Sequence, residues 1–221
     1  MSPKAAPKRR RQPFGTRLSK DTPKSRRTRV RILDAAMRLF AEVGYHAATN
    51  SEIAAAAELT RGAMLYHFAT REALVEAAAE HIQQARLALF DAAAADPPPG
   101  GDATSHAIEA YWRLLSTPAF VAFAELEAVA RTDAMVRERL EGAQAAFDRA
   151  QVGETFSALA QAGLGPRFQA SRDLARFLLE GLARASLAYD GPERIANLIV
   201  VVDRAVRMLN RKGDVQELWP E

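Results

Sequence analysis

Apolar residues recur at the three- and four-residue spacing of an α-helix in almost every long segment of this chain from residue 25 onward. No segment alternates apolar and polar residues as a half-buried strand does, and no repeat of solenoid length occurs. The clearest interruption is the proline- and glycine-rich run at residues 96–101. We therefore expect an all-α fold, with a small N-terminal bundle and a larger C-terminal helical domain.

The composition removes several classes of catalytic and metal site. The chain has no cysteine, which excludes a disulfide scaffold, a zinc ribbon, an iron–sulfur site and a thiol nucleophile. None of its four histidines lies three residues after a glutamate, and neither a His-Glu-x-x-His motif nor a glycine-rich phosphate loop occurs. We expect no catalytic residues, no metal and no cofactor; an all-α enzyme is an alternative that these observations disfavour.

No stretch of the chain approaches the ~18 to 20 uninterrupted apolar residues that span a bilayer. The N-terminus is basic and contains proline, without the apolar region of a signal peptide. We therefore expect a cytoplasmic protein with no membrane partner.

Positive charge is concentrated at the N-terminus. Residues 1–31 hold twelve Lys and Arg against one acid, Asp21, a net charge of +11, so the other 190 residues carry −8 of the overall +3. Residues 1–24 contain four prolines and few apolar side chains, and we interpret them as a disordered basic arm. Two interpretations of this arm stay open: contact with nucleic acid, or a solvated tail that aids solubility.

A first amphipathic helix is expected from residue 25 to Gly44, which is a plausible C-terminal cap. Its apolar stripe has the spacing of one helix face and comprises Leu33, Ala36, Met37 and Phe40, widened by Ile32, Leu39 and Val43. A helix of this kind requires partners to cover the stripe.

Two short helices joined by a very short turn are expected next. Thr49-Asn50-Ser51-Glu52 is a capping box that starts the second helix, and Thr60 is a start signal for the third. A fourth, long helix opens at Thr70 and runs to about Ala95. This is the profile of a helix-turn-helix, in which the second short helix enters the DNA major groove with its N-terminal end.

Residues 28–77 resemble the DNA-binding domain of the TetR family of transcriptional repressors. The motifs that carry the resemblance are Leu39-Phe40-Ala41-Glu42-Val43-Gly44, Glu52-Ile53-Ala54, Thr60-Arg61-Gly62 and Tyr66-His67-Phe68. After the basic arm at 1–24, the resemblance implies a three-helix DNA-binding domain with the helix-turn-helix at 25–76 and a helical effector-binding and dimerisation domain at 77–221. It implies a ligand-responsive, sequence-specific regulator, most often a repressor, that binds a pseudo-palindromic double-stranded operator as a homodimer.

Two positions depart from the family pattern. Glu58 stands where the turn commonly has glycine, and Leu65 stands where a tyrosine is more usual. The first removes an easy left-handed residue, and the second removes one phosphate donor. A non-specific nucleic-acid-binding protein that uses the basic arm is the main alternative function.

Carried over from the family, the phosphate contacts are Thr49, Tyr66, His67 and Arg71. Base readout falls to Arg61, which can donate two parallel bonds to guanine, while Gly62 and Ala63 permit close approach. The alternatives are structural: Thr60 is also expected to cap its helix, and His67 is also explained as a hydrogen-bonded histidine of the bundle.

The resemblance also implies a pocket for an unidentified small molecule in the second domain. The candidate lining residues are aromatic or polar, and comprise His106, Tyr111, Trp112, Phe120, Phe123, Glu127, Phe147 and Phe156, with Glu125 and Arg131 as further polar anchors. The alternative for each aromatic residue is an ordinary place in the core.

The last two helices, expected at 168–190 and 192–211, each carry a clean apolar face, and Gly181 and Ala185 allow close helix approach. We expect this pair to meet its copy in a four-helix dimer interface. The expected interface residues are Leu174, Phe177, Leu178, Gly181, Leu182, Ala185, Ile195, Leu198, Ile199, Val202, Val206 and Leu209. The alternative is that both helices complete the core of one protomer.

Overall fold

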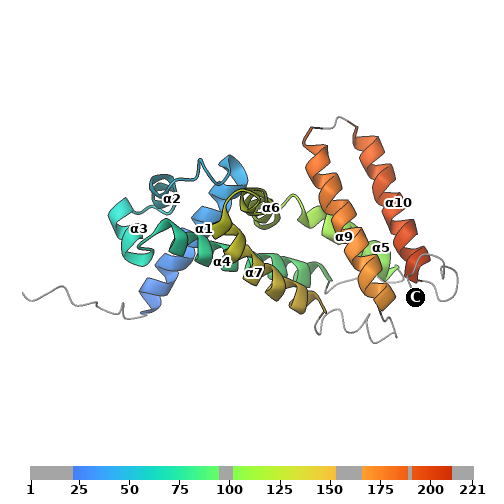
Figure 1. Ribbon diagram of the computed structural model, residues 1–221, viewed down its shortest axis with the longest axis horizontal. Helices are drawn as coiled ribbons and strands as arrows, with labels where there is room; N and C mark the ends of the chain where they lie inside the picture. Colours follow the sequence, from blue (N-terminus) through green and yellow to red (C-terminus); the bar gives the residue numbers. More distant parts are fainter. Residues whose placement is uncertain (1–21, 95–101, 153–165, 189–190, 211–221) are drawn as a thin grey trace, which may run out of the picture.

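The structure is a computed structural model that describes residues 22–94, 102–152, 166–188 and 191–210. These residues form α-helices and no strand, which confirms the all-α prediction (Figure 1). The helices are α1 (Pro23–Val43), α2 (Asn50–Ala56), α3 (Arg61–His67), α4 (Arg71–Ala94), α5 (Ala103–Leu114), α6 (Pro118–Ala130), α7 (Ala134–Val152), α9 (Pro166–Ser186) and α10 (Pro192–Asn210).

The described residues contain neither a membrane-spanning helix nor a cluster of metal ligands. No helix there has both the length and the apolar character needed to cross a bilayer. No three His, Asp or Glu side chains of that part gather as metal ligands would.

Four helices begin with a proline, namely α1, α6, α9 and α10. Proline suits the first helical position because its missing N–H has no partner there in any case. This explains why α1 starts at Pro23, two residues earlier than the sequence predicted, with the Thr22 hydroxyl accepting the Ser25 N–H at 3.2 Å. Residues 1–21 of the expected basic arm lie outside the described residues.

The starts of α2 and α3 are fixed by threonine caps, as predicted. The Thr49 hydroxyl accepts the Glu52 N–H at 3.3 Å, and the Glu52 carboxylate accepts the Thr49 N–H at 2.9 Å, which completes the capping box. The Thr49 hydroxyl and the Thr49 N–H both donate to the Glu52 carboxylate, and these two bonds lower the pKa of the Glu52 carboxyl. At α3, the Thr60 hydroxyl accepts the Ala63 N–H at 3.1 Å.

The turn between α2 and α3 has the left-handed geometry that usually requires glycine. Glu58, which follows the C-cap residue Ala57 of α2, takes this geometry with φ of +53°. The Glu58 N–H donates to the Ala55 carbonyl at 2.9 Å and the Leu59 N–H to the Ala54 carbonyl at 2.8 Å, the two bonds of a Schellman motif. The turn therefore keeps its family geometry without the glycine, at the expense of local strain.

The first hydrophobic core extends beyond the helix-turn-helix. It joins apolar side chains of α1, α2, α3 and α4 to Phe123 and Leu126 of α6 and to Val136 of α7. Helix α6 packs against both α1 and α4, so that one core holds the N-terminal bundle and part of the second domain together (Figure 1). Val43, expected on the apolar stripe of α1, is instead 52% exposed, because it lies in the last turn beyond this contact.

A second core lies among α4, α5, α6, α9 and α10. Its buried members are Phe90, Ile108, Tyr111, Leu114, Phe120, Ala175, Leu179, Val202 and Val206. Helices α9 and α10 lie side by side and contact α5 (Figure 1). Val202 and Val206, which the sequence placed in a dimer interface, are only 7% and 6% exposed within one protomer. That part of the prediction is wrong, since the inner face of α10 is covered by its own chain.

We predict that Glu58→Gly raises the free energy of unfolding by about 0.5 to 1 kcal/mol. A side chain in the left-handed region is unfavourable by roughly 1–2 kcal/mol, and glycine loses part of that gain through the greater freedom of the unfolded chain. Urea unfolding of the full chain at one protein concentration measures the change. The matched control is Ala55→Gly inside α2, which should destabilise by about 0.5 to 1 kcal/mol. Destabilisation by Glu58→Gly would contradict the conclusion that the left-handed conformation of Glu58 is strained.

Candidate nucleic-acid interface and ligand pocket

Helix α3 has one buried face and one face that is open to solvent. Met64 is fully buried, and Phe68, directly after the helix, is 2% exposed, so both belong to the first core. Arg61, Gly62 and Ala63 at the N-terminal end are exposed, and the Tyr66 side chain is 69% exposed. The end of α3 that the sequence assigned to base readout is therefore the accessible end.

Gly62 has open space around it. A Cβ atom built at this position would meet no other atom of the protein within 4 Å. Packing within the chain therefore does not require glycine at this position. The close approach of another molecule to α3 would require it.

Arg71 has a different place from the one the sequence assigned. Its guanidinium donates to the Ala48 carbonyl at 2.8 Å and to the Tyr45 carbonyl at 3.0 Å, and it lies 4.7 Å from the centre of the Tyr45 ring. It ties the start of α4 to the connection between α1 and α2. We therefore replace its expected role as a phosphate contact with a structural one, because its donors are directed at protein carbonyls.

Arg29 of α1 makes a similar contact at the other end of the helix-turn-helix, after α3. Its guanidinium donates to the His67 carbonyl at 2.8 Å and lies 4.2 Å from the centre of the Phe68 ring. Burial, followed by the charge of Arg29, lowers the pKa of the His67 imidazole. This shift favours the neutral imidazole in the DNA-free protein.

The hydroxyls of Thr49 and Thr60 both act in caps. The Thr49 hydroxyl also donates to the Glu52 carboxylate at 2.5 Å, and this bond occupies its proton. The cap role that the sequence gave to Thr60 is confirmed, whereas DNA contact by either threonine stays a prediction.

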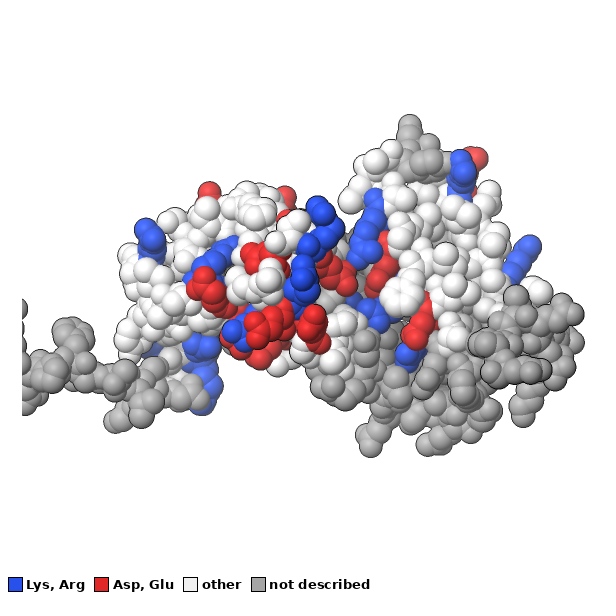
Figure 2. Space-filling view, viewed as in Figure 1, with Lys and Arg blue, Asp and Glu red and all other residues white. Residues whose placement is uncertain are grey.

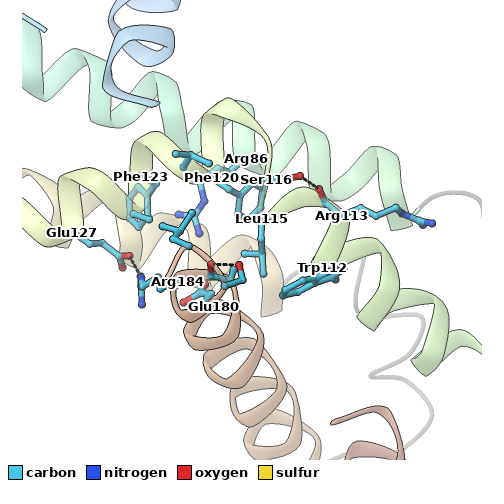
Figure 3. Close-up of a pocket in the computed structure, with 15 residues that line it drawn as sticks. Arg86, Trp112, Arg113, Leu115, Ser116, Phe120, Phe123, Glu127, Glu180 and Arg184 are labelled. Atoms are coloured by element: carbon cyan, nitrogen blue, oxygen red, sulfur yellow. Dashed lines mark hydrogen bonds and ion pairs between the residues drawn. The ribbon is translucent and has the colours of Figure 1, made fainter. Parts of the chain in front are cut away.

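A pocket of about 690 Å³ lies between α4, α5, α6 and α9. Trp112, Phe120 and Phe123 form aromatic parts of its wall, with Leu115 beside them (Figure 3). Val121 also lines the pocket. Its volume lies within the range of small-molecule sites. In the space-filling view the surface is indented between the α6 region and α9 (Figure 2).

Three helices contribute charged side chains to this pocket. Arg184 of α9 donates to the Glu127 carboxylate of α6 at 2.7 Å (Figure 3). Arg86 of α4 is only 2% exposed, and its guanidinium lies 4.0 Å from the centre of the Phe123 ring and 4.7 Å from that of Phe120. Burial raises the pKa of the Glu127 carboxyl, and the neighbouring Glu180 raises it further.

Four of the predicted pocket residues line the pocket, namely Trp112, Phe120, Phe123 and Glu127. Tyr111 does not, since it is buried in the second core and donates its hydroxyl to Glu180 at 2.7 Å. His106 lies at the other end of α5, where its ring nitrogen contacts the Ala93 carbonyl at 3.2 Å. The side chains of Phe147 and Phe156 lie outside the described residues.

Arg86, Glu180 and Arg184 line the pocket and were missed from the sequence. Arg86 had a signal: it follows Ile82 by four residues and precedes Phe90 by four, which places a charge on the buried stripe of α4. The sequence gave no such signal for Glu180 and Arg184, because charged residues are common on the exposed face of any helix.

Glu125, a predicted polar anchor, faces the N-terminal bundle instead of the pocket. Its carboxylate accepts the Tyr45 N–H at 2.9 Å, and a Cβ atom on Gly44 would stand 3.0 Å from the same oxygen. Gly44 has φ of +84°, so both its conformation and this close approach favour glycine. Helix α6 thus contacts the pocket on one side and the α1–α2 connection on another.

The outer face of α9 and α10 is apolar and exposed. Phe177 is 63% exposed, Leu174, Leu178 and Leu198 are exposed as well, and Gly181 has no neighbouring atom within 4 Å of its Cβ position. Ala185 is exposed, whereas Leu182, Ile195, Ile199 and Leu209 are half-buried. Figure 2 shows a broad surface without charge over this pair of helices.

Comparisons with known proteins agree with this architecture. Residues 32–78 match the family model described as bacterial regulatory proteins, tetR family. The HTH-type transcriptional regulator UidR of Escherichia coli K12 is 38% identical over 63 residues, which are 28% of this chain and 32% of that protein. The chain therefore matches about a third of the length of this curated relative.

Solved structures cover more of the chain at lower identity. A protein from Rhodococcus sp., described as a TetR-family transcriptional regulator, has a TM-score of 0.63 and 22% identity, over 83% of this chain and 98% of that one. The multidrug binding protein EbrR complexed with ethidium has a TM-score of 0.55 and 23% identity, over 83% of this chain and 99% of that one. At these identities the likeness is one of fold.

We predict that Arg71→Met lowers the free energy of unfolding by about 2–3 kcal/mol, because hydrogen bonds from a charged donor contribute about 1.5–3 kcal/mol. The control is Arg61→Met, which removes an exposed guanidinium and should change the stability by less than about 0.5 kcal/mol. Urea unfolding of both variants measures the difference. An equally small effect at both positions would return Arg71 to the set of possible phosphate contacts.

Proposed function

The chain belongs to the TetR family of bacterial regulatory proteins, and on that premise we propose that it is a dimeric, ligand-responsive repressor that binds a pseudo-palindromic DNA operator. The observation that carries this proposal is the open N-terminal end of α3, where Arg61, Gly62 and Ala63 are exposed above a buried Met64. A helix held in this way can enter the major groove.

Specific recognition would depend on Arg61. A guanidinium can donate two parallel bonds to O6 and N7 of guanine, and the small side chains beside Arg61 allow the backbone to come close. Exposed Tyr66 and half-buried His67 would position the helix on the phosphates. Thr49 would join them by turning its hydroxyl proton away from the Glu52 carboxylate. Two such helices related by a dyad call for half-sites about one helical turn, or a little more, apart.

Ligand response would pass through α6. This helix lines the pocket with Phe120, Phe123 and Glu127, and it accepts the Tyr45 N–H through Glu125 at the base of the helix-turn-helix. A ligand that favours a shifted α6 would therefore bias the orientation of the recognition helices. The ligand-bound structure of EbrR, a protein of the same fold, supports a small-molecule site in this architecture.

Dimerisation would use the exposed face of α9 and α10. Phe177, Leu178 and Leu198 lie on that face, and Gly181 and Ala185 leave room for a second helix. Large apolar surface of this kind is unfavourable in water unless a partner covers it.

The alternative is non-specific binding of nucleic acid through the N-terminal positive charge. Lys24, Arg26, Arg27 and Arg31 are exposed on α1 and continue the basic run of the sequence. The ratio of specific to non-specific affinity separates the two functions, since it is large for a repressor and near one for a packaging protein.

We predict that Arg61→Ala weakens binding to the native operator by about 1–3 kcal/mol, or roughly 5- to 150-fold. The operator is first selected from random duplex DNA with the purified chain, and affinity is then measured by gel shift against the selected and a scrambled duplex at one salt concentration. The control is Arg204→Ala, an exposed arginine of α10. An equal loss of affinity for both duplexes would mean that Arg61 contacts the DNA backbone. If the unaltered chain bound both duplexes with nearly equal affinity, the non-specific alternative would be favoured.

We predict that Phe177→Glu yields a folded monomer on a sizing column with unchanged helix content by circular dichroism. Val43→Glu, at another exposed apolar position outside α9 and α10, should leave the dimer intact. Val202→Glu should lower stability instead, because it buries a charge in the protomer core. A persistent dimer in the Phe177 variant would remove this face from the interface.

A further inference from the structure

The two helices of the helix-turn-helix carry no net positive charge. From Thr49 to Phe68, which spans α2, the turn and α3, the charged residues are Glu52, Glu58 and Arg61, a net charge of −1 with histidine neutral. All three are exposed. A large share of the affinity for duplex DNA comes from cationic side chains that neutralise phosphates. A DNA-binding surface built around α3 therefore needs cations from another element.

The first three turns of α1 contain one lysine, four arginines and no acid. Lys24, Arg27 and Arg31 are exposed and recur at the spacing of one helix face, which we call the basic face of α1. The next acid along the helix, Asp34, contacts the His81 ring of α4 at 2.7 Å. The start of α1 thus presents positive charge that no acid of the same turns offsets.

Like charges on the basic face repel one another. Arg27 and Arg31 are four residues apart and are therefore neighbours on the surface of α1, where a pair of like charges lowers helix stability. A row of phosphates beside this face would relieve the repulsion, because guanidinium groups form strong, charge-assisted hydrogen bonds with phosphate oxygens. The face is therefore suited to a polyanion.

The basic face lies beside the recognition helix. Arg29, which stands between Arg27 and Arg31 in the sequence, donates to the carbonyl of His67, the last residue of α3, at 2.8 Å. The residues of the basic face lie within about 8 Å of Arg29 along the helix axis. The start of α1 is at the same end of the molecule as α2 and α3, away from α9 and α10 (Figure 1), and Lys and Arg side chains gather there (Figure 2). Because a helix in the major groove is flanked by sugar-phosphate backbones, a surface beside α3 can meet phosphates.

We infer that the basic face of α1 is a second DNA-binding surface, which contacts the phosphates that flank the bases read by α3. This inference rests on the proposed repressor and adds to it a contact that the helix-turn-helix itself does not make. A contact with phosphates strengthens binding to every duplex and fixes the orientation of α3 without selecting a sequence.

The test is the double variant Arg27→Gln/Arg31→Gln, which removes four guanidinium groups from a dimer. It should weaken binding to the selected and the scrambled duplex by the same factor, roughly tenfold or more at about 0.1 M salt. A plot of the logarithm of affinity against the logarithm of salt concentration should become less steep by roughly 2 to 4, because each lost phosphate contact removes about 0.9. Gel shift over a series of salt concentrations measures both quantities.

The matched control is Arg113→Gln/Arg204→Gln, which removes the same charge at exposed positions of α5 and α10. It should leave the salt dependence unchanged. Circular dichroism and urea unfolding of both double variants establish that each is folded.

A hydroxyl-radical footprint on the selected operator gives a second measurement. The unaltered chain should protect the DNA backbone beyond the base pairs that α3 reads. Arg27→Gln/Arg31→Gln should lose this outer protection and keep the protection at the centre of each half-site.

A salt dependence as steep as that of the unaltered chain, a loss of affinity no greater than that of the control, or an unchanged footprint would overturn the assignment. A loss confined to the selected duplex would also overturn it, since the two arginines would then read bases. Nearly equal affinity of the unaltered chain for both duplexes would reject the repressor. A less steep salt dependence in the double variant would still assign DNA contact to the basic face.

Discussion

The packing of α6 against α1 and α4 is the contact on which the rest of this structure depends. Phe123 and Leu126 belong to the same core as Ile32 and Met64. The helix-turn-helix is therefore packed against α6 and is not a separate domain on a linker. The bond from the Tyr45 N–H to Glu125 adds a directional contact to this packing. Because core packing is tight and resists continuous deformation, a change in the position of α6 must move one neighbour or the other. This packing is the physical basis of the proposed ligand response.

Three arginines hold this arrangement in place, and each combines an aromatic face with a hydrogen bond. Arg29 and Arg71 donate to backbone carbonyls at the two ends of the helix-turn-helix. Arg86 lies between the Phe123 ring of the first core and the Phe120 ring of the second. Lysine is no substitute at such positions, because it lacks the planar fork and the flat face that stacks on a ring. The same type of side chain thus fixes the fold at two sites and lines the pocket at the third.

The sequence could predict what depends on neighbours along the chain. The capping box, the Thr60 cap and the periodicity of the apolar residues act over three or four positions, and the structure confirms them. The errors concern contacts between distant segments. Arg71 reaches back to Tyr45, 26 residues away, and Tyr111 donates to Glu180, 69 residues away. Nothing in the local pattern distinguishes an arginine directed at a carbonyl from one directed at a phosphate.

By itself, the sequence determined the all-α class and the helix-turn-helix, because short-range hydrogen bonding and helical period specify them. The tertiary structure decided which apolar face of each helix is covered by its own chain. Val202 and Val206 are buried whereas Phe177 remains exposed, although all three fit the same helical pattern. It also brought Arg86, Glu127 and Arg184 from three helices to one pocket. Such proximity is set by how helices pack against one another, which periodicity along one helix does not specify.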